Sequence, residues 1–345
     1  MTTSLRTKIF VIIIILGMFV FAELAARAYF FVKKSFLKEE RRISKTIGWE
    51  NKEFISKEYS LPGYSSRPIH YSTQQYGFRV FGNPKSQKVK ILVVGDSYTD
   101  AHTVSDGEEY YAQLTIRNGD IEVFAYGCGG YSTLQEFFIM DKYLDIIKPD
   151  LIVWQFHSND LINNSYKLES ACPEDNNHMR RPYYERGRIH MRYPQEDRGI
   201  FYNMAQHSYL LKLLNINIDF LSLSDGDKCF DRMTPEHAEM KEAIRTTYSI
   251  LNIAQKRAGP IPIVAFSADD HLWINSIFAN LCQQNDIRYL GIIPQILKEA
   301  ESRGKIVNGL ADSHWNRLGH YLIGRTIYDY LAVNGFLKKI QQNNN

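Results

Sequence analysis

The chain has 345 residues, of which 44% are hydrophobic and 23% are charged. This is the composition of a globular protein, and it excludes a disordered, collagen-like or repeat-dominated chain. Residues 1–45 hold 9 basic and 3 acidic residues, which leaves 32 basic and 35 acidic residues in the rest of the chain. A body with a small negative charge lacks the basic surface of a nucleic-acid-binding protein, so we expect no nucleic acid partner.

The cysteines lie far apart in the sequence, at positions 128, 172, 229 and 282. They form no C-x-x-C pair, and the sequence has no H-E-x-x-H motif, which are patterns typical of zinc sites. The sequence therefore predicts neither a metal site nor a cofactor.

The N-terminus carries a long apolar run. Residues 9–22 are uninterrupted, but 14 residues at about 1.5 Å each fall short of the roughly 30 Å hydrocarbon core of a membrane. The run reaches 24 residues if it continues to Val32 and if Glu23 and Arg27, four positions apart, neutralise each other. We predict a membrane anchor over residues 1–34, with a signal peptide cleaved at Ala26-x-Ala28 as the alternative.

The charges around this run leave its orientation open. Arg6 and Lys8 precede it, whereas six basic residues follow it between positions 33 and 45. Taken alone, the positive-inside rule places the body in the cytoplasm. A short basic start followed by an apolar run is nevertheless typical of exported proteins, and we expect a periplasmic or extracellular body.

Residues 35–88 are polar and rich in turn residues, which predicts a linker that wraps onto a domain. Apolar, β-branched runs typical of strands buried on both faces then occur at residues 89–94, 121–125, 151–156, 261–266 and 287–293. Helical stretches lie between and after them, at residues 108–117, 133–147, 235–257, 273–284 and 317–331. This alternation predicts a three-layer α/β/α sandwich with a parallel sheet over residues 89–335, followed by a polar tail at 336–345.

One segment interrupts the alternation after the third strand. Residues 160–234 are rich in Asn, Arg and Tyr, and a loop of about 75 residues is usually functional or disordered. We interpret it as an inserted cap, with a hairpin at 181–191 that turns at Arg186-Gly187 and a short helix at 209–214. Cys172 and Cys229 lie near its two ends, either as a disulfide that closes the cap or as two free thiols.

Chemically useful residues follow the predicted strands. The carboxyl ends of parallel strands meet at the edge of the sheet where ligands bind. Ser97 follows the first strand, the glycine-rich segment 127–130 follows the second, and Asn159 follows the third. Asp312 and His314 precede the last helix. A nucleophile, oxyanion donors and an Asp/His pair at one edge predict acyl-transfer chemistry.

Taken together, these segments resemble the GDSL or SGNH hydrolases over residues 75–331. The matching blocks occur in the family's order: Tyr76-Gly77-Phe78-Arg79, Gly95-Asp96-Ser97, Gly130-Tyr131-Ser132-Thr133, Asn159-Asp160 and Asp312-x-His314. The resemblance implies a flavodoxin-like parallel five-stranded sheet and export from the cytoplasm. It also implies Ser97 as nucleophile, an oxyanion hole of Ser97, Gly130 and Asn159, His314 as base and Asp312 as its orienter.

The chain departs from the family pattern at two points. His157 stands where the third block usually has glycine, and Asp312 and His314 are two positions apart instead of three. The shorter spacing, followed by Trp, also occurs in acetylesterase and acetyltransferase relatives. We predict His157 as a substrate contact because it occupies a block position of the family. We predict Tyr183 and Arg188 as further contacts, because their side chains suit stacking on a sugar and hydrogen bonding to it.

Three functions fit these observations. The leading hypothesis is a membrane-anchored serine esterase that removes an acyl group, most plausibly O-acetyl, from a carbohydrate or a small ester. The first alternative is a polysaccharide O-acetyltransferase that uses the same acyl-enzyme. It requires a multi-spanning acyl-donor partner, because a single helix cannot carry an acyl group across a bilayer. The second alternative is an inactive glycan-binding envelope module, against which the intact Ser97, Asp312 and His314 argue.

Overall fold

The computed structural model describes residues 5–32, 40–171, 179–194, 196, 208–213, 234–310 and 313–338. The chain divides into two compact units. The smaller unit consists of Met1–Arg41 and Gln195–Arg232, and the larger one of Arg42–Pro194 and Met233–Asn345. The larger unit holds the central sheet and every predicted site residue that lies within the described ranges.

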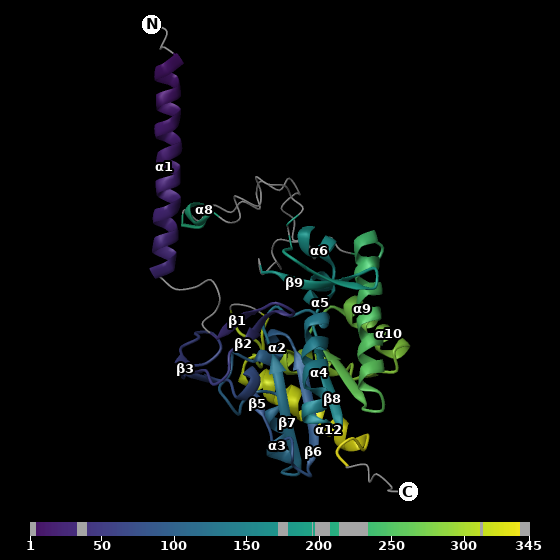
Figure 1. Cartoon of the computed structure of the whole chain (residues 1–345). Coiled ribbons are helices and arrows are strands. Elements are labelled where there is room, and N and C mark those ends of the chain that lie inside the picture. The colour runs from purple at the N-terminus through teal and green to yellow at the C-terminus, as the bar shows by residue number, and fades with distance from the viewer. Residues whose placement is uncertain are drawn as a thin grey trace. The chain divides into compact units, whose positions relative to one another are not determined.

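The larger unit is built on a six-stranded sheet in the order β12-β11-β8-β6-β7-β5 (Figure 1). Its strands are β5 Val80–Phe81, β6 Val89–Gly95, β7 Ile121–Gly127, β8 Leu151–Phe156, β11 Ile263–Ser267 and β12 Arg288–Tyr289. Strands β6, β7, β8, β11 and β12 are parallel and follow the flavodoxin-like order 2-1-3-4-5. The predicted fold class is confirmed with one correction, because β5 pairs antiparallel with β7 and adds a sixth strand.

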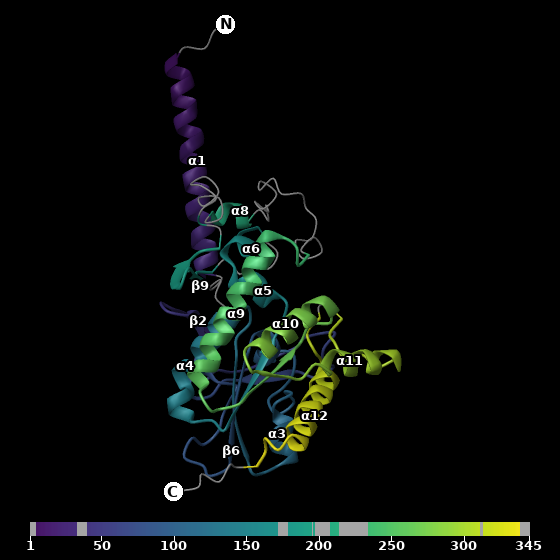
Figure 2. The same ribbon diagram turned by 90° about the vertical axis from the view of Figure 1, so that its right-hand side faces the viewer.

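Helices cover both faces of this sheet (Figure 2). They are α2 Ser97–Asp100, α3 Ala112–Arg117, α4 Thr133–Ile147, α5 Asn159–Asn164, α6 Tyr166–Ala171, α9 Ala238–Ala258, α10 Leu272–Gln284, α11 Ile293–Ser302 and α12 Arg317–Val333. Helices α3, α11 and α12 pack on one face, and α4 and α9 lie on the other. Ile91 and Leu92 are consecutive and both fully buried, so β6 is covered on both sides. Its sequence therefore reads as a continuous apolar run.

The C-terminal part of the sheet differs from the expectation. Residues 287–293 are predicted as a strand, but β12 is limited to Arg288–Tyr289 and Ile293 begins α11. Pro294 in the first turn of α11 has no N–H group to lose from the helix, and its fixed φ favours a helix start. The sequence pattern alone did not predict this helix.

Residues 42–88 form a packed part of the larger unit. Strand β1 (Arg41–Ser44) pairs with β2 (Gly48–Asn51), and β3 (Ser56–Tyr59) pairs antiparallel with β4 (Ile69–Ser72). A short 3₁₀ helix, η1, follows at Gln75–Gly77. The segment is anchored at separate points by large apolar side chains that are themselves buried, namely Trp49, Ile69, Tyr71 and Phe78. Because these anchors are scattered, the sequence shows no alternation and resembles a linker.

Arg79 fastens this segment to the loop that precedes α3. Its fully buried guanidinium group lies 2.7 Å from the carboxylate of Glu109 and 3.1 Å from that of Asp106. The same group lies 4.0 Å from the ring centroid of Tyr71, whose hydroxyl group donates a 2.7 Å hydrogen bond to Asp100. We call Arg79, Asp106 and Glu109 the Arg79 cluster. The Tyr76-Gly77-Phe78-Arg79 block therefore has a structural role.

The first part of the insertion folds onto the larger unit. Helices α5 and α6 pack against α9, and strands β9 (Arg181–Glu185) and β10 (Arg188–Arg192) form the predicted hairpin around Arg186-Gly187. The side chain of Arg181 pairs with Glu169 at 3.0 Å, and both are fully buried.

Tyr183 belongs to this buried group. It has no exposed surface, and its hydroxyl group donates a 2.8 Å hydrogen bond to Glu169. The prediction that Tyr183 contacts substrate is therefore wrong, because the ring packs the base of the hairpin. Arg188 is exposed. Cys172 and Cys229, the two cysteines of the proposed disulfide, lie outside the described residues.

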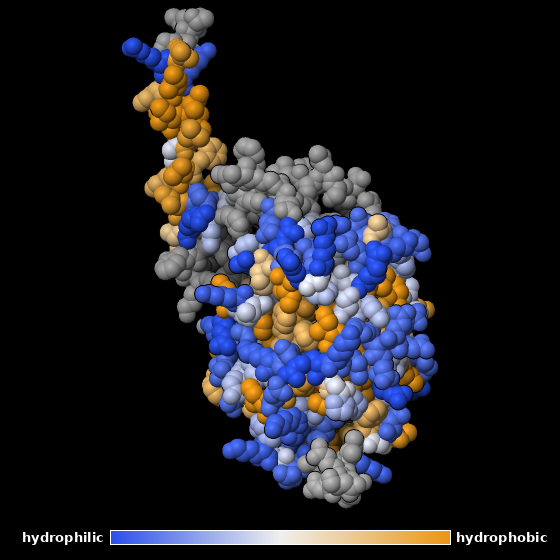
Figure 3. Space-filling view, turned by 45° about the vertical axis from the view of Figure 1, so that its right-hand side comes forward, coloured by the Kyte–Doolittle hydropathy of each residue, from blue (hydrophilic) through white to orange (hydrophobic). Residues whose placement is uncertain are grey.

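The smaller unit contains α1, Leu5–Val32, and α8, Tyr209–Leu213. Among the described residues, only α1 has a stretch, Leu5–Tyr29, that is long and apolar enough to cross a membrane. Figure 3 shows hydrophobic side chains along most of it. The predicted pairing of Glu23 with Arg27 is present at 2.9 Å. Glu23 also accepts hydrogen bonds from the backbone N–H groups of Tyr209 and Leu210, both at 3.0 Å.

Candidate active site

The candidate nucleophile stands at the carboxyl end of the central strand. Ser97 is the first residue of α2, directly after β6. Asp96 caps this helix, because its carboxylate accepts a 3.0 Å hydrogen bond from the N–H group of Tyr98. Its own N–H group donates to the side chain of Gln155 on β8 at 3.1 Å. The turn that presents Ser97 is thus fixed from two sides.

A glycine at the end of the neighbouring strand makes room for this turn. A Cβ atom on Gly127 would collide with the backbone of Thr99 and Asp100 in α2. From the sequence, segment 127–130 is expected to supply an oxyanion donor. The structure shows that its first glycine admits α2, so the requirement for glycine there is one of packing.

The structure brings the predicted base to the predicted nucleophile. The Nε2 atom of His314 lies 2.7 Å from Oγ of Ser97, although 217 positions separate the two residues. Two neighbours hold the His314 loop. Trp315 is buried in the core, and Asn316 caps α12 by accepting hydrogen bonds from the N–H groups of Leu318 and Gly319. Asp312 lies outside the described residues, so its role as the orienter of His314 remains a prediction.

Tyr98 organises the rings around the base. It stacks on His314 with ring centroids 4.7 Å apart and on His157 with centroids 5.0 Å apart. Its hydroxyl group lies 3.0 Å from Oγ of Ser313, and burial raises the pKa of Tyr98 well above its ordinary value. Tyr98 is thus a neutral ring that supports both imidazoles. The role of Tyr98 was not predicted, and its position directly after the nucleophile is the only feature of the sequence that indicates it.

The proposed oxyanion donors flank the nucleophile in the sheet. Strand β6 lies between β7 and β8. Gly130 follows β7 with a φ of 79°, and Asn159 follows β8 as the first residue of α5. Ser97, Gly130 and Asn159 therefore come from the carboxyl ends of three adjacent parallel strands. This is the edge at which such sheets bind ligands.

His157 and an unpredicted carboxylate extend this edge toward β11. The Nδ1 atom of His157 lies 3.1 Å from Oδ1 of Asn159, and its Nε2 atom lies 3.8 Å from Oδ2 of Asp269. Asp269 follows β11 and accepts hydrogen bonds from the N–H groups of Ser158 and His271, at 3.2 and 2.7 Å. Burial alone would raise the pKa of Asp269, but His157 and these hydrogen bonds lower it overall. Its place after the fourth parallel strand was a usable sequence signal.

Three buried carboxyl groups lie in the layer beneath the edge, and we call Asp96, Glu136 and Asp160 the acid cluster. Glu136 accepts a 2.5 Å hydrogen bond from the indole N–H group of Trp154, and Asp160 accepts one of 3.1 Å from the N–H group of His157. Burial raises the pKa of Glu136 and of Asp160 well above the ordinary values, and the charge of Asp96 raises both further. Both carboxyl groups therefore hold a proton more tightly than exposed carboxyl groups do.

The described residues include one group with the spacing of metal ligands. Ligand atoms of Asp269, Asp270 and His271 lie within 4.8 Å of one another. The Nδ1 atom of His271 already pairs with the carboxylates of Asp269 and Asp270, at 2.7 and 3.3 Å. We interpret the group as a cluster of ion pairs.

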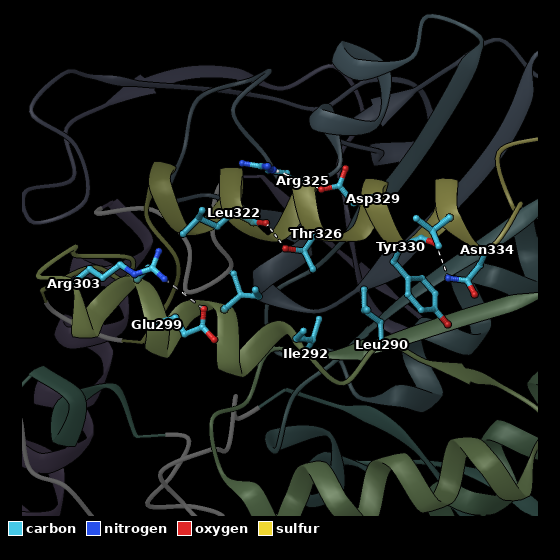
Figure 4. A pocket seen from close by; sticks show the side chains of 13 residues that line it. Leu290, Ile292, Glu299, Arg303, Leu322, Arg325, Thr326, Asp329, Tyr330 and Asn334 are labelled. Atoms are coloured by element: carbon cyan, nitrogen blue, oxygen red, sulfur yellow. Dashed lines mark hydrogen bonds and ion pairs between the residues drawn. The ribbon is translucent and has the colours of Figure 1, made fainter.

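A groove of about 560 Å³ lies elsewhere on the larger unit, between α11 and α12 (Figure 4). Its floor includes Leu290, Ile292 and Leu322, and its rim carries the side chains of Glu299 and Arg303. None of the predicted site residues lines it. We therefore place the candidate active site at the strand ends.

Comparison with known proteins gives remote matches only. No family model and no curated protein matches the chain. Solved structures similar to it include a G-D-S-L family lipolytic protein of Veillonella parvula, with 14% identity, 70% of this chain and 98% of that chain covered and a TM-score of 0.40. A lipase/acylhydrolase of Enterococcus faecalis has 13% identity, coverage of 73% and 98% and a TM-score of 0.41. The acetyl xylan esterase AlAXEase has 11% identity, coverage of 70% and 100% and a TM-score of 0.39. Similarities this remote do not bear on the substrate.

Proposed function

We propose that this chain is a serine esterase of the SGNH or GDSL type, which hydrolyses an acyl ester through an acyl-enzyme on Ser97. The observation that carries the proposal is the 2.7 Å contact between Oγ of Ser97 and Nε2 of His314. A serine hydroxyl group becomes an effective nucleophile when a neighbouring base can take its proton. The contact supplies that base at the ligand-binding edge of the sheet.

The proposed reaction has two halves. Ser97 attacks the carbonyl carbon of the ester while His314 takes the hydroxyl proton, and His314 then returns the proton to the departing alcohol. Water next attacks the acyl-enzyme, again with His314 as base, and the carboxylic acid leaves as Ser97 recovers its proton. In both halves the N–H groups of Ser97 and Gly130 and the amide of Asn159 would hold the oxyanion, and Asp312 would orient His314.

We propose a short acyl group, acetyl, on a carbohydrate. The Asp312-x-His314 spacing followed by Trp315, which also occurs in acetylesterase relatives of the resembling family, favours acetyl over a long fatty acyl group. Arg188, exposed on the hairpin, is the remaining predicted sugar contact of the insertion.

The ester specificity and the nucleophile can be tested together. The full-length chain in detergent is assayed with the 4-nitrophenyl esters of acetate, butyrate and octanoate, and acetate release is measured from acetylated polysaccharides. Acetate esters should react fastest. Ser97→Ala should lower turnover by at least about 10³-fold, because it removes the nucleophile. The matched control, Ser302→Ala at the exposed end of α11, should retain full activity. A Ser97→Ala protein with more than a tenth of the native activity would contradict the mechanism.

We further propose that α1 anchors the protein with the larger unit outside the cytoplasm. The apolar length of α1 and the pairing of Glu23 with Arg27, which lowers the cost of placing two charges in a membrane, support the anchor. An alkaline phosphatase reporter, active only after export, is fused after residue 45. It should be active, whereas a cytoplasmic reporter at the same position should be silent. The opposite pattern would exclude an external substrate, and loss of α1 from the mature protein would favour a cleaved signal.

A further inference from the structure

His157 lies between two hydrogen-bond acceptors, the side-chain oxygen of Asn159 and the carboxylate of Asp269. It lies in the loop after β8, where the family resemblance leads one to expect a glycine without a side chain. On one side its Nδ1 atom faces Oδ1 of Asn159 at 3.1 Å, and on the other its Nε2 atom faces the carboxylate of Asp269 at 3.8 Å. The side chain of His157 is 21% exposed and that of Asp269 is 2% exposed, so the ion-paired contact is largely shielded from water.

The chemistry of these neighbours determines where protons sit on the ring. The carbonyl oxygen of an asparagine side chain can only accept a hydrogen bond, so the 3.1 Å contact requires a proton on Nδ1. The carboxylate of Asp269 attracts a second proton to Nε2. The contacts of His157 are therefore best satisfied by the imidazolium form, with one N–H group toward Asn159 and the other toward Asp269.

The neutral ring would make different contacts. The backbone N–H group of Asn159 also faces Nδ1, at 3.4 Å, and can donate to it only when Nδ1 carries no proton. In that state Oδ1 of Asn159 loses its donor, and the amide is free to rotate and present either its oxygen or its nitrogen to the substrate. Since an amide oxygen repels an oxyanion, this rotation would weaken the oxyanion hole.

We propose that His157 is a positioning residue that fixes the side-chain amide of Asn159, so that the NH₂ group faces the oxyanion formed on the ester. The inference rests on the proposed esterase function. This role differs from the predicted substrate contact, because His157 touches Asn159 and not the substrate. Asp269 supports it by favouring the protonated ring.

Four groups surround His157 in the structure. They are Asp269 at Nε2, Asp160 at the backbone N–H group, Asn159 at Nδ1 and the neutral ring of Tyr98 on one face. His271 and Asp270 lie behind Asp269, and His314 lies against Tyr98. Of these neighbours, Asn159 is the one that the resemblance places in the oxyanion hole.

Four substitutions separate this role from simple packing. His157→Asn places an amide N–H group near the position of Nδ1, whereas His157→Gln places one near Nε2, and His157→Phe keeps only the ring. The fourth, Asp269→Asn, keeps the shape and removes the charge. The assay is hydrolysis of 4-nitrophenyl acetate by the full-length chain in detergent, with kcat and KM measured across pH and folding checked by circular dichroism.

We expect His157→Phe and His157→Gln to lower kcat by about 10- to 100-fold with KM within about twofold, which is part of the 10²- to 10³-fold loss typical of removing an oxyanion donor. His157→Asn should recover kcat to within about threefold of native. Asp269→Asn should lower kcat by less than His157→Phe, because the imidazole ring and its contact with Asn159 remain. Combined with Asn159→Ala, the Phe variant should add no further loss, because the two residues act as one unit.

Two results would overturn the inference. One is a His157→Phe enzyme with native kcat. The other is a fully additive loss in the double variant with Asn159→Ala. Ser97→Ala, measured alongside, separates this failure from failure of the esterase proposal. If native protein and Ser97→Ala release 4-nitrophenol equally, the function itself is wrong. If Ser97→Ala is inactive and His157→Phe is unaffected, only the role of His157 is.

Discussion

Two groups of buried charged residues in the larger unit are built in opposite ways. In the Arg79 cluster a buried cation faces two carboxylates, at 2.7 and 3.1 Å, and the charges are paired. In the acid cluster beneath Ser97, each carboxyl group instead accepts a hydrogen bond from a neutral N–H group. Burial then raises the pKa of Glu136 and Asp160.

The difference follows from what each group does. The Arg79 cluster joins two segments of chain, and charge pairing serves that purpose. The acid cluster lies under the edge where an oxyanion would form. The raised pKa values of Glu136 and Asp160 reduce the negative charge that would oppose it, since a nearby negative charge disfavours another. The first cluster should therefore affect stability, and the edge above the second should affect turnover.

The sharpest test of this separation is at the nucleophile and its base. Ser97→Ala and His314→Ala should each lower kcat by at least about 10³-fold, and the double variant should be no worse, because the pair acts as a unit. The melting temperature should change little in any of the three. His190→Ala, an exposed histidine on β10, is the matched control and should keep native kcat. Additive losses in the double variant would separate the two residues.

Arg79→Met should show the reverse pattern. It leaves Glu109 as an uncompensated buried carboxylate, and such losses cost about 3–5 kcal/mol of unfolding free energy. Urea denaturation measures this loss, while kcat of the folded enzyme should stay within about threefold of native. The control is Arg67→Met, whose 69% exposed side chain pairs with Glu108 at 3.4 Å. That exposed pair should contribute no more than about 1 kcal/mol. A kcat loss as large as that of Ser97→Ala would break the comparison.

Glu136→Gln should have the smallest effect on kcat, and its effect on the unfolding free energy should depend on pH. A glutamine amide resembles the protonated carboxyl group, so kcat should remain within about threefold of native. The pKa of Glu136 is raised above its ordinary value of 4.5, so the folded state binds the proton more tightly than the unfolded state. Its contribution is complete at low pH and is lost as pH rises toward the raised pKa.

Glu136→Gln removes this titration. Its unfolding free energy relative to native should therefore increase as pH rises above about 4.5, which urea denaturation at several pH values measures. Gln113→Glu, a substitution outside the acid cluster, controls for general effects of added or removed charge. A relative stability of Glu136→Gln that does not vary with pH would show that Glu136 is ionised in the folded protein.

Much of the fold was accessible from the sequence, because strands buried on both faces leave continuous apolar runs. Strand β8 and helix α4 have the bounds that the sequence predicts. The sixth strand was not predictable in this way, since Val80–Phe81 is too short to carry a pattern. Residues 35–88 were interpreted as a linker that wraps onto a domain, because the contacts of the described part are made by single side chains such as Trp49.

The candidate site also contains residues that the sequence predicts and residues that it does not. Ser97 and His314 could be identified because each stands in a recognisable block, and the structure brings them into contact. Tyr98 and Asp269 act through contacts with residues distant in the sequence, so their places after Ser97 and after β11 indicate a position at the edge of the sheet but not the contacts made there. Tyr183 was predicted to contact substrate because it is an aromatic residue in a polar insertion. Such a residue can equally well be buried and pack the insertion itself, as Tyr183 does. Asp312, Arg188 and the oxyanion donors remain predictions.

The two outermost strands of the central sheet, β5 and β12, are only two residues long. A strand at the border of a sheet exposes unpaired backbone N–H and C=O groups, and a long one offers a template on which a second chain can add a strand. Borders as short as Val80–Phe81 and Arg288–Tyr289 present few such groups. The short outer strands therefore limit aggregation and have no part in catalysis. A protein whose apolar strands are this continuous would otherwise be prone to edge-to-edge aggregation while it folds.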